Sequence, residues 1–139
     1  MIDLIQIFTI SVMPKPLMIK LVLTGQAKSL LPLDLDGIYH LQDELVNTHP
    51  FWNQVNGNNS IWFGKEDFIG FLRARRNYRY WHIGPKEHLG TNMGNILGPR
   101  GIDISPTRLT NGWRLYSNGL KEVAPFEITF QDLSPCKYL

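Results

Sequence analysis

The chain has 139 residues, of which 14 are Lys or Arg and 12 are Asp or Glu, so its net charge at pH 7 is only +2. This length predicts one domain that buries a core of its own, and the small net charge provides no global field for binding nucleic acid. The single cysteine, Cys136, excludes an intrachain disulfide and a zinc or iron–sulfur site built from cysteines.

Residues 1–13, MIDLIQIFTISVM, are strongly apolar. They lack the basic start of a secretory signal and are too few to span a bilayer as a helix. We expect a strand that is apolar on both faces, which needs cover on both sides. Contact with another protein or a second copy of the chain is therefore predicted for Ile2, Leu4, Ile5, Ile7, Phe8 and Ile10. Two alternatives stay open: burial in the domain's own core, and a weak signal anchor that includes residues 17–23.

Two further stretches show the alternation of half-buried strands. Residues 126–131, FEITFQ, alternate apolar and polar side chains. Residues 17–23 are a second predicted strand, in which a period of two places one set of side chains on a single face. This set is Leu17, Ile19, Leu21 and Leu23.

Residues 37–84 contain three of the four tryptophans, in short aromatic runs that turn residues interrupt. These runs, GIYHL, PFWNQV, NSIWFG and YRYWHIG, are typical of strands in a compact sheet. The Asn56-Gly57 pair predicts a tight hairpin between the second run and the third. Because buried aromatic rings contribute large apolar areas, the tryptophans are expected to be core anchors.

Residues 64–77 interrupt two strands, 61–63 and 78–83, that are natural hairpin neighbours. We interpret this piece as an insertion at the hairpin tip, which forms either one short helix over residues 65–76 or a mobile loop. Residues 84–101 contain five glycines and two prolines, which predicts a long irregular loop. A short strand over residues 113–117 follows between two Asn-Gly turns.

A set of core aromatics and turn glycines recurs along the chain: Gly37, Tyr39, the run I-W-F, Trp81, Ile83, Gly84, Pro106 and Trp113. Together these positions resemble a small β-rich module found within large eukaryotic proteins. The resemblance covers about residues 35–130 and implies a fold. Because the shared positions are core aromatics and turn glycines, the resemblance carries over no functional residue, and the insertion at 64–77 departs from it.

Catalytic and metal-binding patterns are missing from the sequence. The four histidines, His40, His49, His82 and His88, have no metal-ligand spacing, and no G-x-S-x-G nucleophile turn occurs. The sequence therefore predicts no enzyme activity, no metal and no cofactor.

The segment RARRNYRYWH, residues 73–82, interleaves four arginines with aromatic residues. Arginine forks bind phosphate or carboxylate, and exposed aromatic rings stack on bases or sugars. On a strand, Tyr78, Tyr80 and His82 share one face, and Arg79, Trp81 and Ile83 share the other. The alternative is a solvated basic loop that leads into a core strand. The candidate binding residues are Arg73, Arg75, Arg76, Tyr78, Arg79, Tyr80 and His82.

The sequence thus predicts an all-β fold: a single antiparallel β-sandwich or open barrel of about seven to nine short strands, with at most one short helix near residues 65–76. One domain covers residues 1–139, with apolar strands over 1–24, an aromatic core over 35–130 and a tail over 131–139. The expected function is a non-enzymatic protein-interaction or structural module of a larger assembly, with another protein or a second copy as the partner. The alternatives are a carbohydrate-binding domain that uses exposed Trp or Tyr, and contact with an anion or nucleic acid through residues 73–82. An intracellular location is favoured, secretion stays open, and no transmembrane segment is expected.

Overall fold

The computed structural model describes residues 16–25, 34–65, 67–69, 74–76, 79–99, 104–109, 112–117, 121–122 and 126–133. Within these ranges the chain is all-β, and its only helical elements are the 3-10 turns η2 (Lys86–His88) and η3 (Pro106–Arg108). The strands are β1 (Met18–Gly25), β2 (Gly37–Val46), β3 (His49–Gln54), β4 (Asn59–Phe63), β5 (Asp67–Ile69), β6 (Ala74–Arg76), β7 (Trp81–Pro85), β8 (Ile96–Leu97), β9 (Arg114–Ser117), β10 (Lys121–Glu122) and β11 (Phe126–Asp132).

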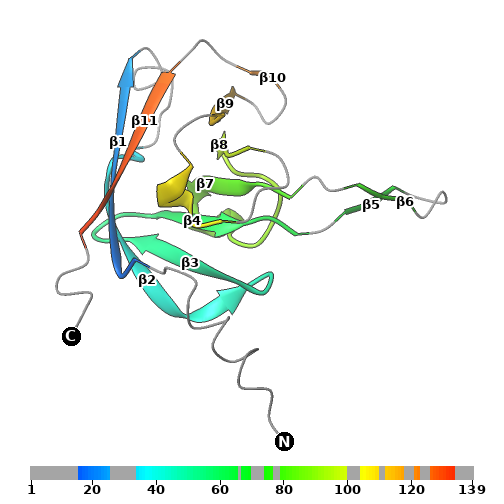
Figure 1. Cartoon of the computed structure of the whole chain (residues 1–139), viewed down its shortest axis with the longest axis horizontal. Helices are drawn as coiled ribbons and strands as arrows, with labels where there is room; N and C mark the ends of the chain where they lie inside the picture. Colours follow the sequence, from blue (N-terminus) through cyan, green and yellow to red (C-terminus); the bar gives the residue numbers. More distant parts are fainter. Residues whose placement is uncertain are drawn as a thin grey trace, which may run out of the picture.

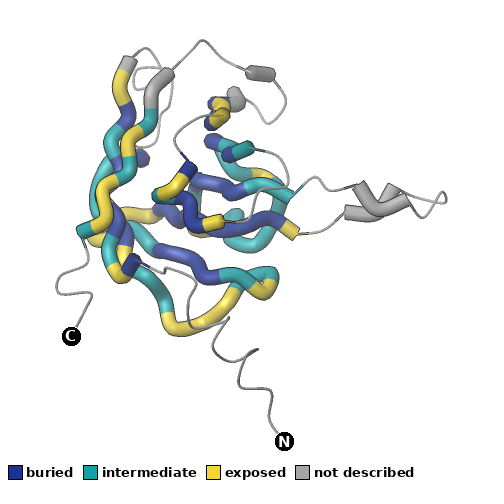
Figure 2. Tube along the Cα trace, viewed as in Figure 1, coloured by how far each residue is buried: buried dark blue, intermediate teal, exposed yellow. Residues whose placement is uncertain are grey.

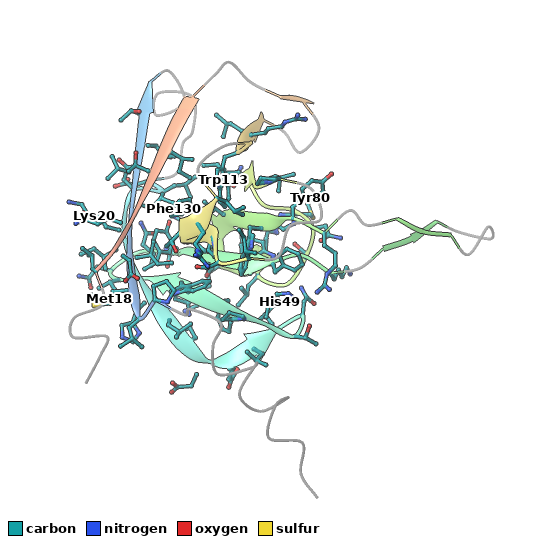
Figure 3. All side chains as sticks on the ribbon, in the orientation of Figure 1. Met18, Lys20, His49, Tyr80, Trp113 and Phe130 are labelled. Carbon is teal, nitrogen blue, oxygen red and sulfur yellow. The ribbon has the colours of Figure 1, made fainter. Side chains whose placement is uncertain are left out.

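Nine of these strands form one sheet in the order β10-β9-β8-β7-β4-β3-β2-β1-β11, and their pairing is antiparallel. The sheet curls, so that β1 and β11 face β8 and β9 across the core (Figure 1). Trp113, which directly precedes β9, packs on Phe130 of β11 with ring centroids 5.1 Å apart (Figure 3). The predicted antiparallel all-β domain is confirmed in the form of a curled sheet.

The local signals in the sequence locate several strands correctly. Asn56 adopts a positive φ of 57° in the turn between β3 and β4, as the Asn-Gly pair predicts. On β1, Ile19 and Leu21 are completely buried and Leu23 nearly so, but Leu17 lies before the strand and is 51% exposed. The prediction that Leu17 shares this buried face is therefore wrong, although its carbonyl oxygen accepts a hydrogen bond from Leu41 N (2.9 Å) in line with the β1–β2 ladder.

All four tryptophans are buried, as expected of core anchors. A buried indole N–H needs an acceptor, and here each one finds a main-chain carbonyl oxygen outside the strands. Each tryptophan therefore ties a connecting segment to the sheet as well as filling space. The bonds are Trp52 Nε1 to Pro16 O (2.8 Å), Trp62 Nε1 to Thr91 O (2.8 Å), Trp81 Nε1 to Ile104 O (2.8 Å) and Trp113 Nε1 to Leu109 O (2.7 Å).

The central strands β4 and β7 are buried on both faces (Figure 2). Their inner face joins the main core through Ile61, Phe63, Trp81 and Ile83. Their outer face carries Trp62 and His82, and residues 86–95 cover it. Two-sided burial explains why these strands read as continuous apolar runs.

Two expectations need correction. Residues 65–76 form no helix where they are described: β5 and β6 pair there as a separate two-stranded sheet. The region 84–101 is not wholly irregular either, because it contains η2 and β8, which pairs with β7 on one side and β9 on the other. Strands of two or three residues are too short for their periodicity to be recognised.

Replacing Trp81 by Ala removes the ring at the centre of the core. Its indole contacts Phe63, Trp52 and His49, with centroid distances of 5.2, 5.8 and 6.2 Å. We expect the free energy of unfolding to fall by about 3–5 kcal/mol, measured by urea denaturation followed with circular dichroism. The control is Met93→Ala, whose side chain is 63% exposed and which should change stability by less than about 0.5 kcal/mol. Equal stabilities for both variants would contradict the central role of Trp81.

Candidate functional site

Strands β5 and β6 form a hairpin-like arm that stands outside the nine-stranded sheet and projects from it (Figure 1). We call these two strands the arm. Their register places Asp67 opposite Arg76 and Phe68 opposite Arg75. Of the predicted binding residues, Arg75 and Arg76 lie on β6 of the arm, whereas Arg73 and Tyr78 lie outside the described residues.

Arg79 sits at the base of the arm, and its guanidinium is engaged with the protein. Nε donates to Gly64 O (3.1 Å), one terminal nitrogen donates to Asn47 O (2.9 Å), and the group lies 4.7 Å from the centre of the Phe63 ring. Because a half-buried guanidinium with two main-chain acceptors is positioned by the fold, Arg79 acts as a structural residue. The prediction that grouped it with the surface arginines of the binding segment is therefore revised.

Side-chain amides hold the rest of the arm base. Asn47, in the β2–β3 turn at a positive φ of 52°, donates to Phe63 O (2.9 Å) and Gly90 O (3.1 Å). Asn92 accepts from Lys65 N (3.0 Å) and donates to Lys65 O (3.1 Å). Since Gly64 N also donates to Tyr80 O (2.8 Å), both chain segments that lead to the arm are fixed to the sheet.

Tyr80 and His82 lie on one face of the chain, as their spacing predicts, and their rings meet edge-on with centroids 6.4 Å apart. Tyr80 is half-buried at the side of the sheet that faces the arm (Figure 3). His82 is only 1% exposed, so the prediction that it contacts a ligand is wrong. No pattern in the sequence predicts that residues 86–95 cover this face.

His82 occupies a close-packed layer beneath those covering residues. Its ring stacks on Trp62 with centroids 5.4 Å apart, and its Nδ1 accepts a hydrogen bond from Gly94 N (3.1 Å). A methyl group on Gly94 would lie 2.6 Å from His82 Cβ, so glycine is needed for this approach. Burial lowers the pKa of His82 to about 4, because a charged imidazole would lose its hydration there.

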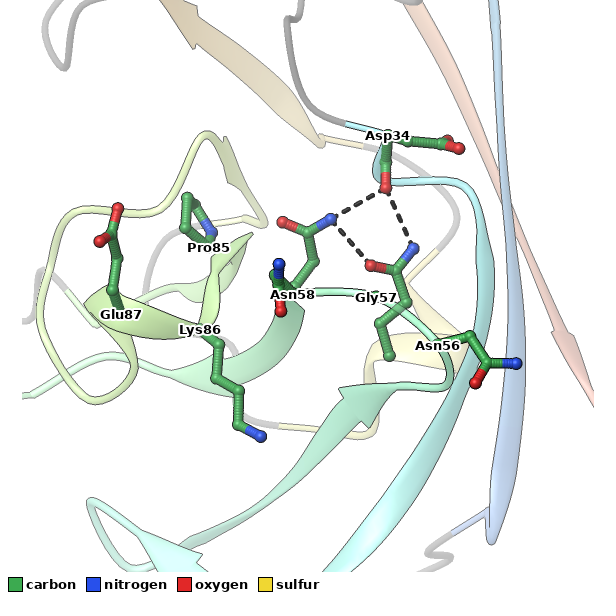
Figure 4. A pocket seen from close by; sticks show the side chains of 9 residues that line it. Asp34, Asn56, Gly57, Asn58, Pro85, Lys86 and Glu87 are labelled. Carbon is green, nitrogen blue, oxygen red and sulfur yellow. Dashed lines mark hydrogen bonds between the residues drawn. The ribbon is translucent and has the colours of Figure 1, made fainter.

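A polar pocket of about 700 Å³ lies at the opposite end of β4 and β7 from the arm (Figure 4). Asp34 stands on one side, and Lys86 and Glu87 stand on the other. Besides these charged residues, the pocket is lined by Gln54, Asn56, Gly57, Asn58, Asn59 and Pro85.

Two amide side chains build the wall beside Asp34. Gln54 Nε2 donates to the main-chain oxygens of Asp34 (3.0 Å) and Asp36 (2.8 Å). Asn59 Nδ2 donates to Asp34 O (2.9 Å) and Gln54 Oε1 (2.9 Å). Within the described part of the chain, Asn59 Oδ1 is buried and has no hydrogen-bond partner. Sequence periodicity could not find this wall, because its members lie far apart along the chain.

Nearby, Tyr39 is fully buried and donates its hydroxyl to Leu35 O (2.7 Å). Burial, and then the negative charges of Asp36 and Asp34, raise the pKa of Tyr39 far above its usual value. Two carboxylates, Asp34 and Asp36, therefore lie near the buried Tyr39 at the pocket end of the sheet.

The remaining sequence predictions have mixed outcomes. Residues 1–13 lie outside the described residues, so their predicted partner contact stays a prediction. Where the chain is described, no group of three or more His, Cys, Asp or Glu side chains could hold a metal ion. Over the same ranges, none of the helical segments has the length and hydropathy needed to cross a bilayer. Trp52 and Trp62, expected to be exposed in the carbohydrate-binding alternative, are 1% and 0% exposed, so they cannot stack on a sugar.

Comparisons of the chain with protein-family models, with curated proteins and with solved structures found no match. The resemblance to a β-rich module of large eukaryotic proteins therefore stays a prediction.

Replacing Arg79 by Met keeps an unbranched chain of similar length but removes the guanidinium. The carbonyls of Gly64 and Asn47 then lose their shared donor. We expect a loss of about 1–3 kcal/mol in the free energy of unfolding, measured by urea denaturation. Arg108→Met, at an exposed position on η3, is the matched control and should leave stability nearly unchanged. A loss no larger than that of the control would show that Arg79 is not structural.

The buried neutral His82 makes stability depend on pH. Between pH 6.5 and about 4 the unfolded chain protonates this residue and the folded chain does not, so stability falls as the pH falls through that range. The full loss is about 3 kcal/mol from this shift alone. Urea unfolding at pH 7.5, 5.5 and 4 measures it, and His82→Gln should lose this component while keeping the contribution of the carboxylates. Identical pH slopes in the two proteins would refute the assignment.

Proposed function

We propose that this domain is a non-enzymatic interaction module that presents the arm to an acidic surface of a partner protein within a larger assembly. The observation that carries the proposal is the arm itself, a two-stranded element outside the main sheet with a firmly held base. A fixed base reduces the entropy lost when a projecting element is ordered on a partner.

The charge of the arm region supports an acidic partner. Residues 65–79 contain one lysine and four arginines against two acidic residues, although the whole chain carries a net charge of only +2. In the register Asp67 lies opposite Arg76, and Arg75 lies opposite the uncharged Phe68. Because a local excess of this size does not extend over the whole molecule, a protein surface fits better than the long phosphate backbone of a nucleic acid.

Burial argues against the two competing classes. A sugar-binding site needs an exposed aromatic platform, and the tryptophans and Tyr39 are in the core. A catalytic site places a group of perturbed pKa in an accessible cleft. Here His82 and Tyr39, whose pKa values are strongly shifted, are 1% and 0% exposed. The pKa shifts of His82 and Tyr39 are therefore a consequence of their burial in the core.

The test replaces Arg75 and Arg76 by Ser and leaves Arg79 in place, because Arg79 supports the fold. The full chain and the double variant are immobilised, and partners from the native source are quantified by mass spectrometry at 50 and 300 mM salt. We expect the wild-type chain to retain a partner in a salt-dependent way and the variant to lose about 10-fold or more of it.

The matched control is Lys20→Ser with Arg108→Ser, which removes two charges from exposed positions on β1 and η3. It should retain the partner like the wild-type chain. Equal retention by all three proteins, or equal loss by both variants, would contradict a specific role of the arm.

A further inference from the structure

The pocket wall beside Asp34 has used all of its amide donors. Both hydrogens of the Gln54 amide and both of the Asn59 amide go to oxygen acceptors of the protein. These bonds fix which end of each amide is nitrogen, because a flipped Asn59 would turn its oxygen toward two other oxygens. What the wall still offers to a ligand is therefore acceptor capacity.

Asn59 is the clearest case. The residue is 5% exposed, and within the described residues its Oδ1 has no donor. Since the amide is planar, Oδ1 points away from the Asp34 and Gln54 network, and Asn59 is one of the residues that line the pocket. Asn58, Lys86 and Glu87 line the same pocket and are exposed, and exposed side chains change rotamer within nanoseconds. Because Oδ1 is itself buried, a donor can reach it only after a movement of neighbouring side chains.

The charged residues of the lining favour a positively charged ligand, because the carboxylates of Asp34 and Glu87 outnumber the ammonium group of Lys86. One oxygen of the Glu87 carboxylate lies 3.8 Å from His88 Nε2. The Asp34 carboxylate is exposed, and the amide network uses only the main-chain oxygen of this residue. A ligand that both donates several N–H groups and carries positive charge satisfies the acceptors and the carboxylates together.

We infer that this pocket binds a guanidinium group, held by Asn59 Oδ1 and the second lone pair of Gln54 Oε1 and attracted by Asp34 and Glu87. A guanidinium is planar and offers five donors without any acceptor, which complements a wall whose donors are all used. The inference is independent of the arm, because the pocket lies at the other end of β4 and β7.

The experiment is a titration of the ¹⁵N-labelled full chain with N-acetyl-arginine amide, followed by nuclear magnetic resonance. Saturable shifts are expected in the amide signals of Gln54, Asn58, Asn59 and Lys86. The reference ligand is N-acetyl-citrulline amide, which has the same length but a neutral urea group. It should bind at least about fivefold more weakly, because it lacks the charge and has a carbonyl oxygen in place of one NH2 group, which removes two donors.

The variant Asp34→Asn with Glu87→Gln removes both carboxylates from the rim and leaves the Asn59 network in place. It should weaken binding of the arginine derivative by about fivefold or more. The matched control is Asp43→Asn with Glu44→Gln, two exposed positions near the far end of β2, where the change should stay below about twofold.

An acetylated pentapeptide with one central arginine among glycines and serines distinguishes the source of the group. Binding at least as tight as that of the arginine derivative assigns the pocket to a polypeptide, and weaker binding assigns it to a free small molecule. The inference is overturned if the arginine derivative gives no saturable shifts, if the citrulline derivative binds equally well, or if the pocket variant and its control lose the same affinity.

Discussion

The fold depends on burying the Trp81 indole between strands that are covered on both faces. Trp81 contacts Phe63, Trp52 and His49, and its N–H donates to Ile104 O. A flat sheet of this size would expose such a ring on one side. The sheet curls instead, and Trp113 meets Phe130 across the enclosed space. The curl therefore follows from the need to enclose aromatic surface in a chain that, where described, has no α-helix to cover it.

Covering the outer face of β4 and β7 imposes a second constraint. Residues 86–95 can lie close to Trp62 and His82 only because glycines stand at the points of contact. A methyl group at Gly64 would lie 2.4 Å from Asn92 Oδ1 and 2.6 Å from His82 Nε2, and one at Gly94 would also clash with His82. The glycine-rich sequence from which an irregular loop is predicted is thus needed for residues 86–95 to pack closely on the outer face of β4 and β7. The same cover makes His82 a buried neutral residue and removes it from the surface.

The sequence predicts the features that depend on near neighbours. Alternation locates β1 and β11, Asn-Gly locates the β3–β4 turn, and the aromatic runs give β3, β4 and β7. It fails where distant residues decide the outcome. One short helix is among the predictions for residues 65–76, yet β5 and β6 pair across the arm. Arg79 looks like a surface arginine because its acceptors lie 15 and 32 residues earlier, and the Asn59 network joins residues 5 and 25 positions away.

The base of the arm and the pocket lie at the two ends of β4 and β7, which are buried on both faces. Asn59 lines the pocket at the start of β4 and Phe63 supports Arg79 at its end, so the pocket wall and the base of the arm are about 13 Å apart along one strand. A ladder that is buried on both faces has little freedom to change its register, because a slip by one residue would exchange the inner and outer faces. A ligand at either end therefore has no second arrangement of β4 and β7 whose population it could increase. On the two proposals above, a guanidinium in the pocket and an acidic surface on the arm would therefore bind as independent ligands, without coupling of their affinities.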